Sequence, residues 1–211
     1  MMEARGLHPL AVKICGITST DDACAAVEAG ADLLGFNFHP PSPRYVSMAT
    51  AASIARRLPA YVGRVGVFVN SEADEVERAI DIVGLDVVQL HGDEPADFGA
   101  QFRVPSLRAL RVDSLEELPA AAQAHPSGWL LVDTADPMLY GGTGRALPLS
   151  SLPSALAARV FVAGGLTPET VTDVVRCVRP LGVDVCSGVE SGPGRKDRLR
   201  LERFVSHAKA A

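Results

Sequence analysis

Short apolar runs of strand length alternate with longer, partly polar segments along the whole chain. A near-continuous apolar run is typical of a strand that is buried on both faces, as in a parallel sheet. The pattern predicts strands at 12–15, 32–38, 64–69, 86–91, 106–112, 128–133, 160–163 and 182–186, with the run at 106–112 the weakest of them.

The segments between these runs carry helix signals. Residues 18–22 supply capping side chains and Gly30 stops the helix that follows, while Thr167, Pro168 and Glu169 supply a cap, a first-turn proline and an early acid. Prolines 40, 41 and 43 exclude regular structure from the loop at 39–45. The pattern predicts helices over 18–29, 48–57, 72–82, 95–102, 115–124 and 150–157, one opening at 167, and a last one over 199–208.

Regular alternation of strands and helices predicts parallel strands joined by right-handed crossovers. Eight such units in 211 residues match a closed (β/α)8 barrel, which we expect to form one domain over 1–211. A doubly wound open sheet is the alternative fold. The first strand lacks the G-x-G-x-x-G turn that such a sheet uses for phosphates, so the α/β fold class is predicted to be the barrel.

Composition excludes several classes of protein. The chain is 47% hydrophobic and 21% charged with a net charge of −5, which argues against nucleic acid as its main partner. No apolar run is long enough to span a bilayer, and the first residues lack a signal-peptide pattern. The four cysteines contain no C-x-x-C pair, which disfavours zinc and dithiol chemistry. We expect free thiols in a reducing cytoplasm.

In a barrel, reactive side chains come from the carboxyl ends of the strands and the loops after them. Each candidate also has a purely structural interpretation: Cys15 as a small core residue, Asp184 and Gln89 as partners within the barrel rim, and His91 as a capping group. The candidates are Cys15, Asn37, Phe38, Arg44, Gln89, His91, Asp133, Gly164, Gly165, Asp184, Cys186, Ser187 and Gly188.

Two pairs of small residues predict a phosphate site. Gly164-Gly165 follows the seventh strand and Ser187-Gly188 follows the eighth, the positions where barrels often bind phosphate with backbone N–H groups. The charged cluster at 195–198 is predicted to be a solvated face.

Several motifs in order along the chain resemble the phosphoribosylanthranilate isomerases of tryptophan biosynthesis. They lie at 13–18, 42–46, 65–68, 88–92, 131–134, 141–144, 163–166 and 183–190. The resemblance implies an Amadori rearrangement of N-(5-phosphoribosyl)anthranilate to 1-(o-carboxyphenylamino)-1-deoxyribulose 5-phosphate, the third step from chorismate, without metal or cofactor. It also implies a cytoplasmic enzyme that is a monomer or a homodimer and whose partner is this small-molecule substrate.

The same resemblance implies roles for individual residues. It assigns the general base to Cys15, the general acid to Asp133 and the anthranilate carboxylate to Arg44. The further expected contacts are His91 and Asp184 to substrate, and Gly164, Gly165, Ser187 and Gly188 to phosphate. A thiol with a pKa of about 8.5 is only a few per cent ionised at pH 7, so modest local help makes it a usable base. An arginine can bind a carboxylate with two parallel hydrogen bonds, which a lysine cannot do.

The chain departs from the family pattern in two places. Residues 145–149 replace an aromatic-acid-aromatic run, and Cys186 stands where serine is common; we interpret Cys186 as a packing residue. Two alternatives to the predicted isomerase stay open. The related Amadori isomerase of histidine biosynthesis, or a version that acts on both substrates, would carry an acid at the end of the first strand, so Cys15 argues against it. The second alternative is a barrel that binds phosphosugars without catalysis, which the altered sequence at 145–149 suggests.

Overall fold

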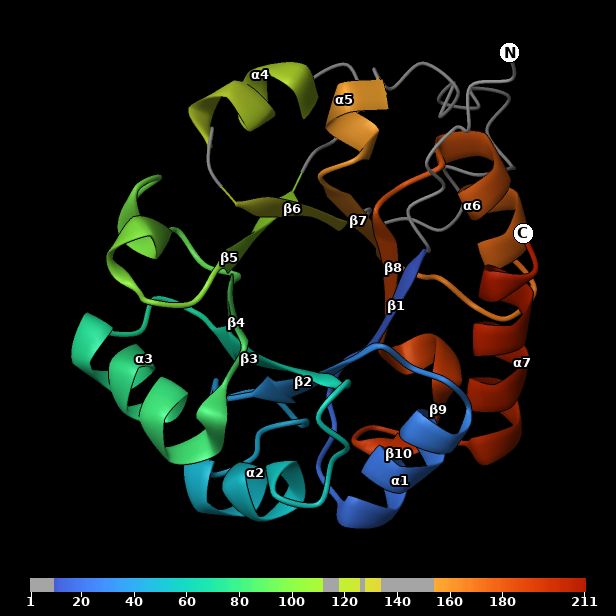
Figure 1. Cartoon of the computed structure of the whole chain (residues 1–211), viewed down its shortest axis with the longest axis horizontal. Helices are drawn as coiled ribbons and strands as arrows, with labels where there is room; N and C mark the ends of the chain where they lie inside the picture. The colour runs from blue at the N-terminus through green and yellow to red at the C-terminus, as the bar shows by residue number, and fades with distance from the viewer. Residues whose placement is uncertain (1–9, 112–117, 126–127, 134–153) are drawn as a thin grey trace.

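The computed structural model describes residues 10–111, 118–125, 128–133 and 154–211. Within these residues, eight parallel strands close into a barrel in sequence order, because β8 pairs with β1 (Figure 1). Closure confirms the predicted barrel and excludes the open sheet. The strands are β1 (Ala11–Ile14), β2 (Leu33–Asn37), β3 (Gly63–Phe68), β4 (Val87–Leu90), β5 (Ser106–Arg111), β6 (Trp129–Asp133), β7 (Val160–Ala163) and β8 (Gly182–Val185).

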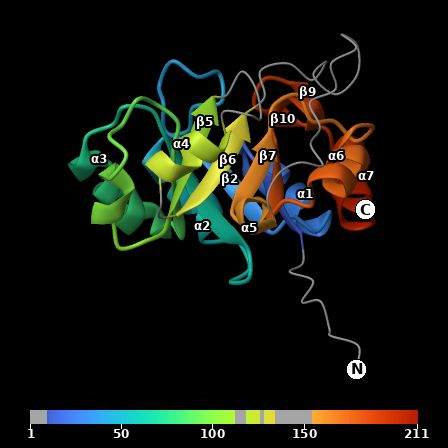
Figure 2. The same cartoon turned by 90° about the horizontal axis from the view of Figure 1, so that it is seen from above.

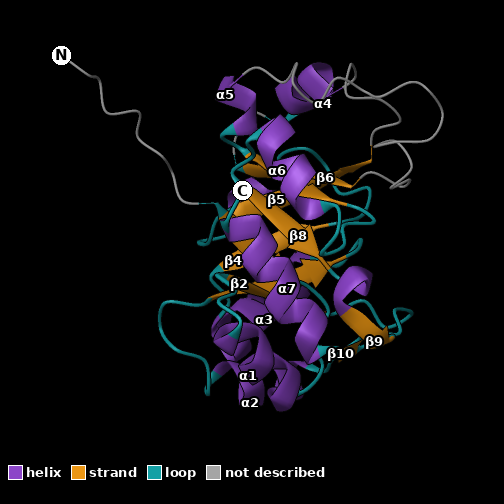
Figure 3. Ribbon diagram, turned by 90° about the vertical axis from the view of Figure 1, so that its right-hand side faces the viewer, coloured by secondary structure: helices purple, strands orange, loops and turns teal. Residues whose placement is uncertain are grey.

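Helices surround the barrel on its outside (Figure 1). In the described part of the chain they are α1 (Thr20–Glu28), α2 (Met48–Ala55), α3 (Ala73–Ala79), α4 (Leu118–Ala124), α5 (Ser154–Ala157), α6 (Val171–Val178) and α7 (Arg198–Lys209). The closing helix α7 contacts both α6 and α1, and Figure 3 shows it between them. No helix among the described residues has the length and apolar character needed to cross a membrane.

The helix signals of the sequence are visible as hydrogen bonds at the helix ends. Ser19 caps α1 by accepting a hydrogen bond from the Asp22 N–H at 3.1 Å, and Asp197 caps α7 in the same way through the Arg200 N–H at 3.0 Å. Gly30 ends the first helix with a φ of 97°, a value that glycine adopts without steric cost. The predicted caps and stop of α1 are therefore confirmed.

The predicted helix over 95–102 is wrong. Only a short 3₁₀ turn, η2 (Phe98–Gln101), forms there. The guanidinium of Arg108 donates to the carbonyls of Glu94 and Pro95, and the Pro95 carbonyl also accepts from the Phe98 N–H at 3.0 Å, which is the i to i+3 hydrogen bond of a 3₁₀ turn. Gly99 packs so tightly against Ser106 that an added Cβ would lie 2.5 Å from the Ser106 hydroxyl oxygen. This close approach requires glycine at position 99, although glycine disfavours a helix.

Other boundaries differ from the predictions. The helix expected from 167 begins at Val171, after a turn in which Thr167 accepts a hydrogen bond from the Glu169 N–H. The helix predicted over 72–82 continues as the π-helical segment η1 (Ile80–Gly84). Parts of other predictions lie outside the described residues: 112, 115–117, 141–144, 145–149 and 150–153. A short antiparallel pair, β9 (Glu190–Gly192) with β10 (Arg195–Lys196), was not predicted.

Alternate strand residues fill two separate apolar layers. Phe161 and Ala163 of β7 belong to a cluster inside the barrel, whereas Val160 and Val162 belong to the larger layer between strands and helices. The same alternation directs polar side chains inward where β1 and β8 meet. In the side view of Figure 2, the strand arrowheads point to one end of the barrel, and β9 and β10 lie at that end.

Candidate active site

The carboxyl ends of the strands surround a cavity of about 280 Å³. All nine residues to which the sequence assigns a role line it: Cys15, Arg44, His91, Asp133, Gly164, Gly165, Asp184, Ser187 and Gly188. The structure therefore brings together residues that are up to 173 positions apart, from Cys15 to Gly188. Among the other candidates, Phe38 is a core residue that stacks near Phe68 at 5.2 Å between ring centroids.

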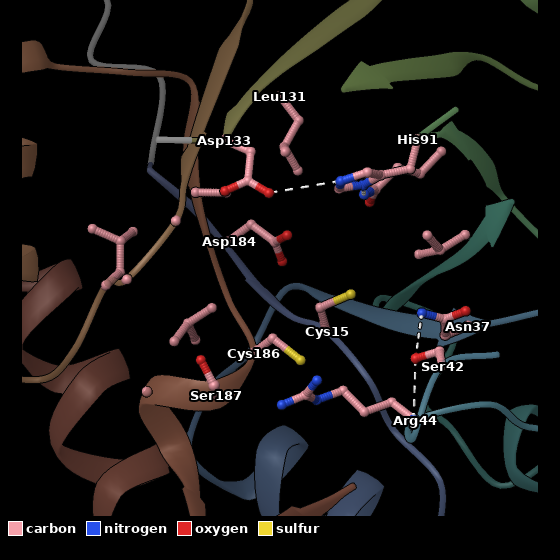
Figure 4. A pocket seen from close by; sticks show the side chains of 18 residues that line it. Cys15, Asn37, Ser42, Arg44, His91, Leu131, Asp133, Asp184, Cys186 and Ser187 are labelled. Atoms are coloured by element: carbon pink, nitrogen blue, oxygen red, sulfur yellow. Dashed lines mark hydrogen bonds and ion pairs between the residues drawn. The ribbon is translucent and has the colours of Figure 1, made fainter. Parts of the chain in front are cut away.

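Cys15 follows β1 directly, and its thiol is at the cavity wall (Figure 4). Its N–H donates to the Val185 carbonyl of β8 at 2.9 Å, which fixes the backbone. Gly35 provides room for the sulfur, because a Cβ there would lie 2.9 Å from Sγ. A hydrogen bond from Cys186 lowers the pKa of Cys15 well below its usual range; burial opposes this shift, and the nearby charge of Lys13 supports it. Cys15 is therefore poised to be a thiolate.

Lys13 and Asp184 form a buried ion pair below the thiol. Their side chains are 0% and 8% exposed, and Lys13 Nζ lies 2.8 Å from Asp184 Oδ1. The two residues are register partners on adjacent strands, so barrel closure itself produces the pair. Burial raises the pKa of Asp184 to about 6, although the Lys13 ammonium opposes that shift. Asp184 also lines the cavity, where a substrate hydroxyl could reach it.

His91 and Asp133 lie on the other side of the cavity (Figure 4). Asp133 is the last residue of β6, and one of its oxygens, Oδ2, is 3.6 Å from His91 Nε2. Gln89 Nε2 lies 3.1 Å from His91 Nδ1. Since an amide nitrogen only donates, this contact makes Nδ1 an acceptor and places the proton of a neutral imidazole on Nε2, facing Asp133. The Gln89 carbonyl oxygen is buried and has no partner among the described residues.

Arg44 extends into the cavity from the proline-rich loop after β2. The loop is ordered by its own polar groups: Ser42 Oγ accepts hydrogen bonds from the Arg44 N–H at 3.1 Å and from the Asn37 side chain at 3.2 Å. The guanidinium makes a two-pronged contact with Glu190, Nε to Oε1 at 2.9 Å and Nη2 to Oε2 at 2.7 Å. Glu190 therefore fixes the orientation of Arg44, and Nη1 lies on the side of the guanidinium that these contacts do not use.

The two loops predicted to bind phosphate touch each other through their backbones. Gly164 and Gly165 have φ values of 89° and 59°, which favour glycine. A Cβ on Gly188 would lie 1.9 Å from the Leu166 carbonyl oxygen, so any larger residue would push the loops apart. Small residues thus allow the chain after β7 and after β8 to form one continuous part of the cavity wall.

Comparison with known proteins identifies the family. A family model described as "PRAI: N-(5'phosphoribosyl)anthranilate (PRA) isomerase" matches residues 12–207. The N-(5'-phosphoribosyl)anthranilate isomerase of Geobacter sp. (strain M21) is 47% identical over 199 residues, which are 94% of this chain and 97% of the relative. The chain belongs to the N-(5'-phosphoribosyl)anthranilate isomerase family.

Solved structures of the isomerase have the same architecture. The crystal structure of phosphoribosyl anthranilate isomerase from Thermotoga maritima matches with a TM-score of 0.84 at 40% identity and covers 96% of this chain and 100% of that one. Another crystal structure of the isomerase, in complex with reduced 1-(o-carboxyphenylamino)-1-deoxyribulose 5-phosphate, matches with a TM-score of 0.83 at 38% identity and the same coverage. Family membership decides against the histidine-pathway isomerase and the non-catalytic barrel.

Two charged residues of this isomerase's site were not predicted. Lys196 Nζ lies 3.0 Å from Glu190 Oε1, and the Lys196 side chain is fully buried. The prediction of a solvated face at 195–198 is therefore wrong for Lys196, although Arg195 and Arg198 are exposed. The Pro-Gly dipeptide at 193–194 signals a turn, which could have revealed the hairpin that directs Lys196 inward.

Glu190 connects these charges to the rest of the site. Burial alone would raise the pKa of Glu190, but the hydrogen bonds from Arg44 and the charge of Lys196 outweigh it and lower that pKa. Glu190 is thus an anion at neutral pH. Its position behind Arg44 could not be inferred from the sequence, because the two residues are 146 positions apart.

Proposed function

We propose that Cys15 is the general base and Asp133 the general acid in the reaction of this family. As a member of the family, the chain is an isomerase that converts N-(5'-phosphoribosyl)anthranilate to 1-(o-carboxyphenylamino)-1-deoxyribulose 5-phosphate in tryptophan biosynthesis. The observation that carries the assignment of roles is a pair of groups on opposite sides of one cavity. One is a buried thiol with a lowered pKa, and the other is a carboxyl group at the end of β6.

The chemistry follows from these two positions. The Asp133 carboxyl group donates its proton to the ribose ring oxygen, the ring bond from that oxygen to C1 breaks, and C1 becomes an iminium carbon. The iminium makes the proton on C2 acidic, and the Cys15 thiolate removes it to give an enolamine. The enolamine tautomerises to the ketone when C1 takes up the proton that the Cys15 thiol now holds and the C2 hydroxyl loses its proton, which restores the Asp133 carboxyl group. Every atom of the substrate is kept, as an isomerisation requires.

His91 supports the acid side of this scheme. Its Nε2–H faces Asp133 at 3.6 Å, and both side chains line the cavity in which the substrate would bind. Asp184 sits between the acid and the base, so a ribose hydroxyl held in the cavity would lie within its reach (Figure 4). We therefore assign substrate binding to both residues.

The two ends of the substrate bind at opposite parts of the cavity in this proposal. Arg44 binds the anthranilate carboxylate through the donors that Glu190 leaves unused, with the orientation set in advance. The phosphate binds to backbone N–H groups of Gly164, Gly165, Ser187 and Gly188. The reduced product named in the complex of a solved relative carries both a carboxylate and a phosphate, which supports this arrangement.

We propose a cytoplasmic enzyme in which one barrel domain over 1–211 carries the whole reaction, as a monomer or a homodimer. All four cysteines, each within the described residues, are free thiols, which suits a reducing compartment. A solved relative from Thermotoga maritima is described as monomers derived from a dimeric isomerase. Sedimentation of the purified chain distinguishes the two oligomeric states.

The roles of Cys15 and Asp133 are tested by following loss of anthranilate fluorescence with purified protein. Cys15→Ala and Asp133→Asn should each lower kcat by about 10²- to 10⁴-fold, the range of a single acid or base. Cys24→Ala is the matched control, because Cys24 is an exposed thiol on α1, and its rate should stay within about twofold of the parent. An unchanged rate in Cys15→Ala would show that another group is the base.

A further inference from the structure

Barrel closure places a second thiol beside Cys15. Ile14 of β1 and Val185 of β8 are register partners, so Cys15 and Cys186 are the next residues on two adjacent strands. Adjacent strands lie about 4.8 Å apart. The Cys186 sulfur fills the space next to Gly16, where an added Cβ would lie 2.9 Å from it. Figure 4 shows both sulfurs at the same wall of the cavity.

The surroundings of Cys186 hold its thiol in one place. Lys196 Nζ lies 3.2 Å from the Cys186 carbonyl oxygen and 3.9 Å from its sulfur. The Cys186 thiol donates a long hydrogen bond of 3.7 Å to Glu190 Oε1, but this oxygen also accepts from Arg44, Lys196 and the Gly194 N–H at 2.9 to 3.3 Å. Because this oxygen already accepts three stronger hydrogen bonds, the thiol proton of Cys186 binds it only weakly. The proton is therefore available to the sulfur of Cys15.

We propose that Cys186 is a positioning residue for the base: its thiol donates a hydrogen bond to the Cys15 sulfur and holds it as a thiolate facing the cavity. This inference rests on the proposed role of Cys15 and replaces the interpretation of Cys186 as a packing residue.

The charges around the two thiols agree with this division of roles. The hydrogen bond with Cys15 raises the pKa of Cys186, so Cys186 keeps its proton while Cys15 loses one. The charged groups that face Cys15 come from four elements: Lys13 on β1, Lys196 on β10 and Arg44 in the loop after β2, with Asp184 on β8 opposing them. Glu190 on β9 pairs with Arg44 and Lys196, so three cations face two carboxyl groups, and this balance favours a single thiolate in the cluster.

The test measures the thiolate directly. Alkylation of Cys15 by iodoacetamide is followed across pH in the folded protein, with modification at this residue quantified by mass spectrometry, because only the thiolate reacts. In Cys186→Ala the midpoint should rise by about one pH unit, so that alkylation below the midpoint slows about tenfold. Cys186→Ser keeps a donor and should stay within about threefold of the parent, as should the exposed-thiol control Cys24→Ala.

Activity provides the second readout. If Cys186 acts through the Cys15 thiolate, the acid side of the kcat/KM profile of Cys186→Ala shifts to higher pH by the same amount, and the rate recovers at high pH. A uniform loss of rate at every pH with an unchanged alkylation midpoint would overturn the proposal. A shifted midpoint together with full activity of Cys15→Ala would instead uphold the thiol pair and refute Cys15 as the base.

Discussion

Replacing Lys13 by methionine should make the barrel lose stability as pH rises above about 6. The Lys13 side chain is fully buried, and its Nζ lies 2.8 Å from Asp184 Oδ1. Methionine keeps most of the side-chain volume but removes the charge. Asp184 then lies in the interior without a cation and must take up a proton to remain there.

The magnitude follows from the pKa of Asp184. Burial raises it from 3.8 to about 6 in the parent, so between these values the folded barrel holds a proton that the unfolded chain has released. Stability therefore falls with rising pH across that window and is constant above it with respect to this group. Without Lys13, which opposes the shift, the window extends upward. Each pH unit above about 6 then lowers the free energy of unfolding of Lys13→Met by about 1.4 kcal/mol. By pH 8 the variant has lost about 3 kcal/mol relative to the parent.

The assay is urea unfolding at pH 6, 7 and 8, followed by circular dichroism. Both chains carry Cys15→Ser, because a thiolate next to Lys13 would add to the same trend. Adding Asp184→Asn to Lys13→Met should abolish the pH dependence. The exposed control Arg198→Met breaks contacts of 2.6 Å with Glu28 and 3.2 Å with Glu202, and it should leave the free energy of unfolding nearly unchanged at every pH because solvent screens these exposed pairs. A pH-independent cost of Lys13→Met would refute the reasoning.

Two further substitutions test the ends of the substrate site. Gly188→Ala places a methyl group against the Leu166 carbonyl and should raise KM at least about tenfold. The control Gly192→Ala has open space around its Cβ and should leave KM and the melting temperature unchanged, so equal effects of the two substitutions would contradict the proposed phosphate loops. Arg44→Lys keeps the charge but loses the two-pronged contact with Glu190, so KM should rise at least about tenfold with less effect on kcat in steady-state kinetics, and an unchanged KM would remove Arg44 from the carboxylate site.

The sequence was sufficient for the barrel and for the residues at its mouth, because both depend on local patterns. Strand-length apolar runs repeat eight times, and the rule that reactive groups follow strand ends then selects Cys15, His91 and Asp133. The cavity contains each of these residues. The helix predicted at 95–102 is only a 3₁₀ turn, and Arg108 binds the carbonyls of Glu94 and Pro95 where that helix would begin, a tertiary contact that no local pattern reports.

The electrostatic environment of Cys15, the proposed base, could not be predicted from local sequence patterns. Lys13 and Asp184 are 171 residues apart, and only closure of β8 onto β1 makes them partners. In the sequence, Lys196 belongs to a charged segment that is typical of a surface. In the structure, the β9–β10 hairpin directs its side chain inward. In both cases the contact is made by chain segments that meet only in the finished fold.

Closure of the barrel also couples folding to catalysis in this chain. The pairing of β1 with β8 joins the first and last strands, so by sequence separation it carries one of the largest loop-closure costs in the barrel. The same pairing aligns Cys15 with Cys186 and joins Lys13 to Asp184, so in an open barrel Cys15 would lack the neighbours that lower its pKa, and the proposed base would be weaker. Pairing of β1 with β8 thus brings together the side chains that lower the pKa of Cys15.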